Sequence, residues 1–189
     1  GAALVFGDLA RSEKLGFIFA FQVLPTIIFF AALMGVLYHA GIMQQIVRGM
    51  AWAITKVMRV SGAETTSVCA SIFIGQTEAP LTIRPYIAKM TQSELLTIMI
   101  GGMAHIAGGV LAAYVGMLGG GDFAGHLVTA SLLSAPAGIL IAKLMIPETQ
   151  TPATTRDSEA LDARSSVNVI DAAAEGALAG LRLAAYVGA

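Results

Sequence analysis

The sequence predicts an all-α, multi-pass membrane protein in which transmembrane helices accompany a re-entrant helical hairpin. Its 189 residues are 56% hydrophobic and only 12% charged, about half of the roughly 25% charged residues usual in soluble domains. Three stretches carry no Asp, Glu, Lys or Arg: Leu15–Val47, Leu95–Gly121 and Phe123–Ala142. Each reaches the roughly 20 residues with which a helix crosses the hydrocarbon core. A fourth apolar stretch is broken by a charge and a proline, which is typical of a re-entrant segment.

The first uncharged stretch is assigned to a transmembrane helix within residues 1–40, whose apolar body is Gly16–His39. Pro25 lies inside this body. Proline removes a backbone donor and crowds the preceding turn, but neighbouring helices make such a defect tolerable in a membrane. The sequence therefore predicts a kink near Leu24–Pro25.

The stretch Thr65–Ile83 is predicted to form a re-entrant hairpin that occupies residues 63–90. Glu78 and Pro80 interrupt the stretch, so it is not expected to cross the membrane as one helix. Broken helices occur in membranes only where the irregular backbone faces protein or a water-filled cavity. The interrupted segment is therefore expected to border such a cavity.

The expected hairpin has one helix entering the membrane at Ala63–Ile74 and another leaving it at Leu81–Ala88. Gly75 and Pro80 bracket the break between the two helices. The tip therefore places three polar side chains deep in the membrane: Gln76, Thr77 and Glu78.

The remaining segments are assigned from charge and periodicity. Residues 41–62 spread cations among apolar residues around Trp52, as in an interfacial amphipathic helix. Residues 91–146 supply two transmembrane helices, and residues 147–166 form a polar loop. Residues 167–189 form an amphipathic helix leading to a missing span, so the chain is interpreted as a fragment of a larger protein. The apolar stripe of this helix is predicted to comprise Val169, Ala173, Ala177, Gly180, Leu181 and Ala184.

Positively charged residues orient the predicted spans. The loop Arg84–Glu94 contains Lys89, and Lys143 follows the last span, whereas Asp122 alone marks the turn between the last two spans. The positive-inside rule places this loop and everything after Lys143 in the cytoplasm. The expected location is the cell (inner) membrane.

Composition and motifs exclude several classes of function. A net charge of −1 provides no basic field to attract nucleic acid. The single cysteine, Cys69, excludes an intramolecular disulfide and a multi-thiolate zinc site. The sequence contains no HExxH, GxxxxGK or GxGxxG pattern, and its three histidines are dispersed. We therefore expect no enzyme activity, no cofactor and no nucleic-acid partner.

Glu78 is the candidate functional residue, because ionisable groups inside a membrane are costly and usually serve a function. Its carboxylate can accept hydrogen bonds from a polar solute, hold a cation or take up a proton. Gln76 and Thr77 add donors and acceptors that can read the edge of a heterocycle. The alternative is that Glu78 snorkels from a shallow hairpin. His105 can relay a proton, and a structural hydrogen-bonded histidine is an equally good interpretation.

The stretch Ala70–Leu81, ASIFIGQTEAPL, resembles the first re-entrant hairpin of the concentrative nucleoside transporter family. The resemblance continues upstream through FQVLPTIIFF at residues 21–30. It also extends to Tyr38-His39, Arg84-Pro85-Tyr86, Ser93-Glu94-Leu95, Ala107-Gly108, Ser134-Ala135-Pro136 and Asn168-Val169-Ile170-Asp171-Ala172-Ala173.

The resemblance implies about half of an elevator-type nucleoside:cation symporter, a homotrimer in the lipid bilayer with a scaffold and a mobile transport domain. The helix within residues 1–40 would belong to the scaffold, and the two helices within residues 91–146 would belong to the transport domain. In such proteins the first hairpin tip contacts the nucleobase. That role passes to Gln76, Thr77 and Glu78, with Gly75 as tip backbone, whereas the ribose-binding elements lie outside this chain.

The resemblance also concerns the coupling ion. Sodium-dependent members hold sodium with an asparagine where this chain has Ser71, with carbonyls near Ile74, and with a pair aligned with His105 and Ile106. Serine is shorter than asparagine, and an imidazole is a poor ligand for a hard cation that prefers oxygen. The sequence therefore predicts a weakened or lost sodium site, with Glu78 and His105 as candidate proton carriers. The coupling ion is H+ or Na+.

Two further function classes stay open at this point. An ion-coupled transporter of another small polar solute could use the same broken hairpin and carboxylate. A non-transporting membrane assembly module would use Glu78 only to hold helices together.

Overall fold

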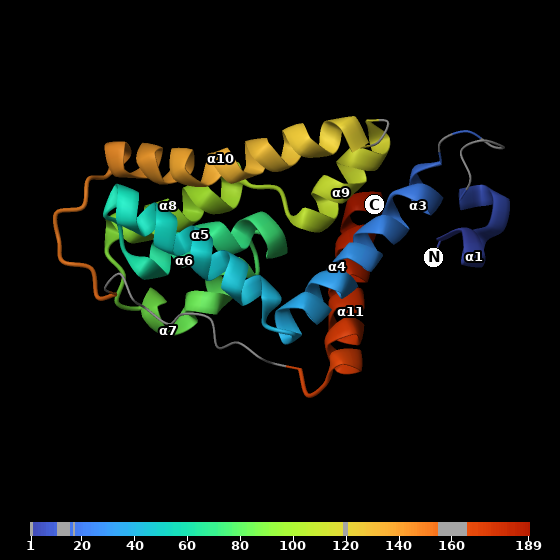
Figure 1. Cartoon of the computed structure of the whole chain (residues 1–189), viewed down its shortest axis with the longest axis horizontal. Helices are drawn as coiled ribbons and strands as arrows, with labels where there is room; N and C mark the ends of the chain where they lie inside the picture. The colour runs from blue at the N-terminus through green and yellow to red at the C-terminus, as the bar shows by residue number, and fades with distance from the viewer. Residues whose placement is uncertain (1, 11–15, 17, 119–120, 155–165) are drawn as a thin grey trace. The chain divides into compact units, whose positions relative to one another are not determined.

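The computed structural model describes residues 2–10, 16, 18–118, 121–154 and 166–189, and helices are the only regular secondary structure within these ranges (Figure 1). The described part contains three stretches that are long and apolar enough to cross a membrane by length and composition: Phe19–His39, Gln92–Met117 and Gly121–Met145. The predicted all-α membrane class is confirmed. Most of the expected polar loop, at residues 155–165, lies outside the described residues.

The chain divides into two compact units. Unit 1 comprises Gly1–Ala40, Gly108–Leu127 and Ser165–Ala189, and unit 2 comprises Gly41–Ala107 and Val128–Arg164. The elements of unit 1 are α1 (Ala2–Phe6), η1 (Gly7–Ala10), α3 (Phe19–Gln22), α4 (Leu24–His39), α9 (Gly108–Met117), the start of α10 (Gly121–Met145) and α11 (Val169–Gly188).

The first predicted span is interrupted at Val23, between α3 and α4. Pro25 lies in the first turn of α4, where its missing N–H needs no helical partner. The Val23 N–H donates to the Phe19 carbonyl oxygen at 2.9 Å, so the backbone stays hydrogen-bonded through the junction. The structure thus interrupts the helix directly before Leu24–Pro25, where the sequence predicts a kink.

Helices α4 and α11 lie side by side in unit 1 (Figure 1). Small residues follow one another at four-residue spacing on α11, where Ala172, Gly180 and Ala184 are buried and Gly176 lies between them. A Cβ added at Gly176 would lie 2.5 Å from the carbonyl oxygen of Ala31 on α4. The two backbones therefore approach closely, as in other membrane helix pairs with small residues at the contact.

The predicted apolar stripe of α11 is wrong in part. Val169 and Leu181 are 51% and 53% exposed, whereas Ala172, outside the predicted stripe, is 3% exposed. The prediction followed side-chain hydrophobicity. In a membrane, large apolar side chains are as stable against lipid as against protein. Close packing of helices therefore selects small residues for the contact.

The close α4–α11 contact predicts that Gly176→Ala lowers the free energy of unfolding by about 1 to 3 kcal/mol, because the added methyl group meets backbone that cannot move aside. Gly116→Ala on α9 is the matched control, since nothing lies within 4 Å of a Cβ at that position. Thermal unfolding of the purified full-length protein that contains this chain would measure both. Equal midpoints for the two variants would contradict the packing argument.

Unit 2 is built around a helix that is buried along most of its length. Its elements are α5 (Ile42–Met58), α6 (Gly62–Ile74), η2 (Ala79–Ile83), α7 (Arg84–Ile87), α8 (Gln92–Ala104) and the remainder of α10. Helix α6 contacts α5, α8 and η2. Every residue of α6 from Gly62 to Ile72 is buried.

Helix α5 is amphipathic, with a buried face at four-residue spacing and an exposed face around Trp52. Trp52 is 62% exposed, and the ammonium of Lys56 lies 4.8 Å from its ring centroid. Such a cation over an indole face is a cation–π contact. The buried face of α5 consists of Met43, Gln44, Val47, Ala51 and Thr55.

The uninterrupted helix expected across Leu95–Gly121 is corrected by the structure. Helix α8 ends at Ala104, His105 has extended backbone angles (φ −111°, ψ 151°), and α9 begins at Gly108. The imidazole Nδ1 of His105 lies 2.6 Å from the Gly101 carbonyl oxygen. In a continuous helix that carbonyl would accept the backbone N–H of residue 105. The side chain of His105 thus takes over the bond that would continue the helix.

Candidate functional site

Helix α6 carries the candidate site at its C-terminal end and is fixed at its N-terminal end by a capping box. The Ser61 hydroxyl accepts the Glu64 N–H at 3.4 Å, and the Glu64 carboxylate accepts the Ser61 N–H at 2.8 Å. This reciprocal pair satisfies donors that a helix start leaves free. The helix then runs through the core of unit 2 to Ile74, so its far end is held by a buried scaffold.

Gly75 ends α6 in a backbone conformation that suits glycine alone. Its φ of 93° and ψ of 171° lie in a region that residues with a Cβ essentially avoid. Its N–H donates to the Ser71 carbonyl oxygen at 3.1 Å, and its carbonyl accepts the Ala79 N–H at 3.1 Å. An added Cβ would lie 3.0 Å from the Cβ of Ala107. Both the turn and its close contact therefore depend on this glycine.

The three tip residues Gln76, Thr77 and Glu78 follow Gly75 as a turn and are exposed. Within the part of the chain that the structure describes, none of their side chains has a hydrogen-bond or ion-pair partner. Together they offer an amide, a hydroxyl and a carboxylate, which can donate to and accept from one polar solute. The arrangement presents unused polar groups at the end of a buried helix.

The structure brings two of the predicted ion-site residues into contact. The Ser71 hydroxyl donates to the Val68 carbonyl oxygen at 2.7 Å and lies 2.8 Å from His105 Nδ1. Because the Gly101 carbonyl can only accept, Nδ1 carries the proton and shares it between this carbonyl and the Ser71 oxygen. His105 is 8% exposed, and its Nε2 is buried without a hydrogen-bond partner among the described residues. The imidazole thus links α6 to the end of α8.

Ile74 and Ile106, the other two predicted ion-site residues, lie beside this link in the chain. Ile74 is the last residue of α6, and Ile106 lies in the break after α8 and is 40% exposed. The contact of Gly75 with Ala107 shows that the end of α6 and the break are adjacent. Neither segment continues its helix at this point.

A second polar cluster of unit 2, not predicted from the sequence, lies at the N-terminal end of α6. There the ammonium of Lys143 lies 2.8 Å from the Glu64 carboxylate and 3.0 Å from the Ser93 hydroxyl. The sequence does carry two capping-box patterns here, Ser61-Gly-Ala-Glu64 and Thr91-Gln-Ser-Glu94. These patterns predict where each helix starts, but not that Lys143 joins the two starts.

This fold and site define a class: a helical membrane protein in which a buried helix ends at a turn with exposed polar side chains. Residues 20–121 match the family described as "Nucleoside recognition". Residues 126–189 match the family described as "Na+ dependent nucleoside transporter C-terminus". The chain belongs to the concentrative nucleoside transporter family.

Relatives and solved structures agree with this assignment. The chain is 50% identical to an "Uncharacterized transporter" of Haemophilus influenzae over 190 residues, covering all of this chain and 45% of the relative. It is 42% identical to "Nucleoside permease NupC" of Helicobacter pylori, covering all of this chain and 45% of that protein. The structure of "CNTnw in an inward-facing substrate-bound state" matches with a TM-score of 0.88 and 45% identity, over all of this chain and 46% of that one. The chain thus spans less than half the length of these relatives.

Proposed function

We propose that the protein containing this chain is a nucleoside:cation symporter that concentrates nucleosides across a membrane by an alternating-access elevator mechanism. The family assignment supports nucleosides as the substrate class. The observation that carries the proposal is the hairpin tip, where three exposed polar side chains stand at the end of a buried helix without partners among the described residues. A transporter needs such groups free to exchange water for a solute.

In this proposal Gln76, Thr77 and Glu78 bind the nucleobase, and the Gly75 turn orients them. The Gln76 amide both donates and accepts, and the Glu78 carboxylate accepts two hydrogen bonds, which suits the donor and acceptor edge of a nucleobase. Charge-assisted hydrogen bonds are about twice as strong as neutral ones, so Glu78 supplies the dominant contact. The ribose would be held by the remaining part of the protein.

We further propose that coupling takes place at the Ser71–His105 contact, with carbonyls near Ile74 and Ile106 as its backbone partners. The Ser71 hydroxyl is already hydrogen-bonded to Val68 and His105, which leaves little capacity for sodium. A weakened sodium site and coupling to protons follow, with Glu78 and His105 as proton carriers. Sodium remains the competing ion, because the matching family is described as Na+ dependent.

The proposed assembly is a homotrimer that spans the inner membrane several times. The loop Arg84–Glu94 and the chain after Lys143 would face the cytoplasm, as their positive charges indicate. Unit 1, where small residues bring α4 and α11 together, would contribute to the scaffold. Unit 2 would be the part that carries the substrate.

Glu78→Gln is expected to lower uptake of labelled uridine by roughly 10- to 100-fold, because a hydrogen bond to a charged group contributes about 1.5 to 3 kcal/mol. Uptake into vesicles containing the full-length protein measures the effect per amount of folded protein. Glu175→Gln, an exposed carboxylate on α11 in unit 1, is the matched control and should transport normally. Unchanged uptake in Glu78→Gln would favour the shallow-hairpin alternative, whereas no uptake by the wild-type protein would favour the non-transporting module.

The coupling proposal is tested by imposing one gradient at a time on the same vesicles. Uptake driven by an inward pH gradient without sodium is the expected result. Uptake that requires sodium and ignores the pH gradient would overturn proton coupling. Competition of uridine uptake by polar solutes unrelated to nucleosides would instead favour a transporter of another substrate.

A further inference from the structure

The N-terminal ends of α6 and α8 and the C-terminal end of α10 meet in unit 2 at a buried polar cluster. Glu64 and Glu94 are 0% and 1% exposed, and each gives one carboxylate oxygen to the capping box of its own helix. Buried carboxylates of this kind need further partners to offset lost hydration. Glu64 finds its partner on α10.

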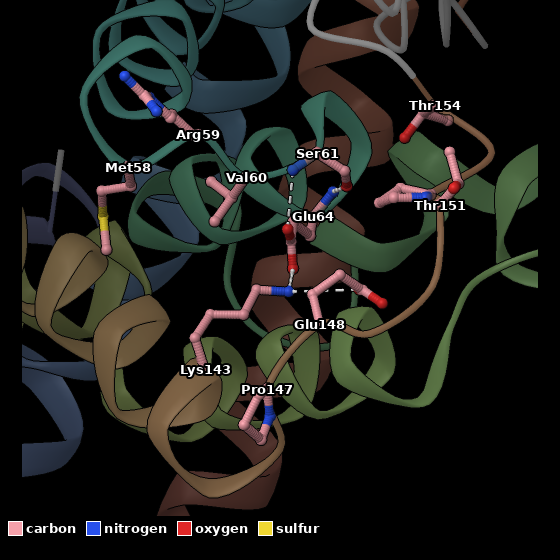
Figure 2. A pocket seen from close by; sticks show the side chains of 11 residues that line it. Met58, Arg59, Val60, Ser61, Glu64, Lys143, Pro147, Glu148, Thr151 and Thr154 are labelled. Carbon is pink, nitrogen blue, oxygen red and sulfur yellow. Dashed lines mark hydrogen bonds and ion pairs between the residues drawn. The ribbon is translucent and has the colours of Figure 1, made fainter.

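Lys143 of α10 lies at the centre of this cluster (Figure 2). Its ammonium lies 2.8 Å from Glu64 Oε2 and donates to the Ser93 hydroxyl at 3.0 Å. Ser93 in turn donates to the Ile146 carbonyl oxygen at 2.7 Å. Glu148 is 3.8 Å from the same ammonium and accepts the Thr91 hydroxyl at 2.6 Å. One lysine therefore joins the start of α6, the start of α8 and the end of α10.

We propose that Lys143 is a positioning residue that holds α6 in register with α8 and thereby sets where the hairpin tip lies. The inference rests on the proposed function for its transport readout, because only in a transporter does the place of the tip determine substrate binding. The register of α6 against α8 can be measured without transport, by hydrogen exchange at the tip. Lys143 itself touches no residue of the tip in the described structure.

The remaining contacts between α6 and α8 explain why the far end would respond. Midway along the pair, Gly101 leaves room for Val68, whose Cγ2 would lie 2.7 Å from an added Cβ. At the end, the Ser71–His105 contact and the approach of Gly75 to Ala107 complete the attachment. A helix of 13 residues is about 20 Å long and stiff. Releasing its first turn therefore lets the whole helix slide or turn against α8.

A pocket of about 730 Å³ borders the cluster and is lined by Arg59, Glu64, Lys143, Glu148 and residues of the loop after α10 (Figure 2). The Lys143 side chain is 18% exposed. The pocket leaves room for a guanidinium, whose fork can contact Glu64 and Ser93 together. Lys143→Arg is therefore the conservative variant that should keep the positioning.

The test uses the full-length protein with three changes: Lys143→Arg, the double variant Glu64→Gln with Lys143→Met, and Lys56→Met as matched control. The double variant removes both charges of the Glu64–Lys143 pair, and the glutamine can still accept the Ser61 N–H, so the cap of α6 is retained. Lys56→Met removes an exposed lysine outside the cluster. Hydrogen exchange and the KM and Vmax for uridine, both per folded protein, are the readouts.

In the double variant, the backbone amides of Gly75 and Ala79, which donate to the carbonyl oxygens of Ser71 and Gly75, are expected to exchange roughly tenfold faster or more, the size of effect expected for loss of a hydrogen bond to a charged group. The uridine KM should rise with little change in Vmax, whereas peptides from α11 should exchange as before. Lys143→Arg and Lys56→Met should behave like wild type. A purely structural role would lower the yield of folded protein without moving KM.

Faster exchange confined to residues 62–66, with the tip and KM unchanged, would overturn the positioning role. So would wild-type exchange throughout the double variant. If the wild-type protein takes up no nucleoside, the proposed function fails, and exchange at the tip still decides whether Lys143 sets the register.

Discussion

Lys143→Met alone is expected to lower the free energy of unfolding by about 3 to 5 kcal/mol, the usual cost of stripping one partner from a buried ion pair. The substitution leaves Glu64 fully buried with its second carboxylate oxygen facing no cation, while the first stays in the capping box. It also removes the donor to the Ser93 hydroxyl. The midpoint of thermal unfolding of the purified full-length protein measures the loss.

The two partners of this pair should not respond equally. Glu64→Gln keeps the cap and leaves Lys143, which is partly exposed, with Ser93 and the nearby Glu148. We therefore expect a smaller loss, and combining Glu64→Gln with Lys143→Met should recover much of the stability lost in Lys143→Met. A double variant as unstable as the sum of both singles would show that the two charges do not interact.

Gly75→Ala is expected to reduce uridine uptake strongly by displacing the hairpin tip. The backbone conformation of Gly75 costs a residue with a Cβ about 1 to 3 kcal/mol. The added methyl group would also lie 3.0 Å from the Cβ of Ala107, which is closer than an ordinary contact. The turn must then change, and the three polar side chains move with it. Uptake kinetics in vesicles, normalised to folded protein, would measure the effect.

Gly49→Ala is the matched control for this prediction. Gly49 lies inside α5, and nothing lies within 4 Å of a Cβ added there. Alanine is favoured over glycine in a helix interior, so this variant should be as stable as wild type or slightly more so. Normal uptake by Gly75→Ala would show that the tip tolerates another turn and that its orientation does not control binding.

Features that depend on neighbouring residues in the chain were predictable from the sequence. The low charge content and long apolar stretches indicated membrane helices, because an ion in hydrocarbon is costly whatever the fold around it. Pro25 indicated the interruption between α3 and α4, since proline limits the backbone on its own. The helix that stops at Gly75 and the polar residues that follow it were visible for the same local reason.

The capping boxes of α6 and α8 were also predictable from neighbouring residues. Their role in joining helices of unit 2 was not. Ser61 with Glu64 and Thr91 with Glu94 have the spacing that starts a helix. The sequence cannot reveal that Lys143, far along the chain, bonds to the first of these carboxylates and not only to water. That pairing exists only because three helices converge.

By itself the sequence determined the helical membrane class, the helix interruption beside Pro25 and the polar tip, since each follows from composition or from a few adjacent residues. Tertiary structure alone decided the break at His105, where the imidazole Nδ1 is hydrogen-bonded to both the Gly101 carbonyl oxygen and the Ser71 hydroxyl. It also decided which face of α11 is buried, since close approach to α4 selects Ala172 and Gly180 over larger apolar residues. These features arise from contacts between residues distant in the chain, whose energies no local pattern records.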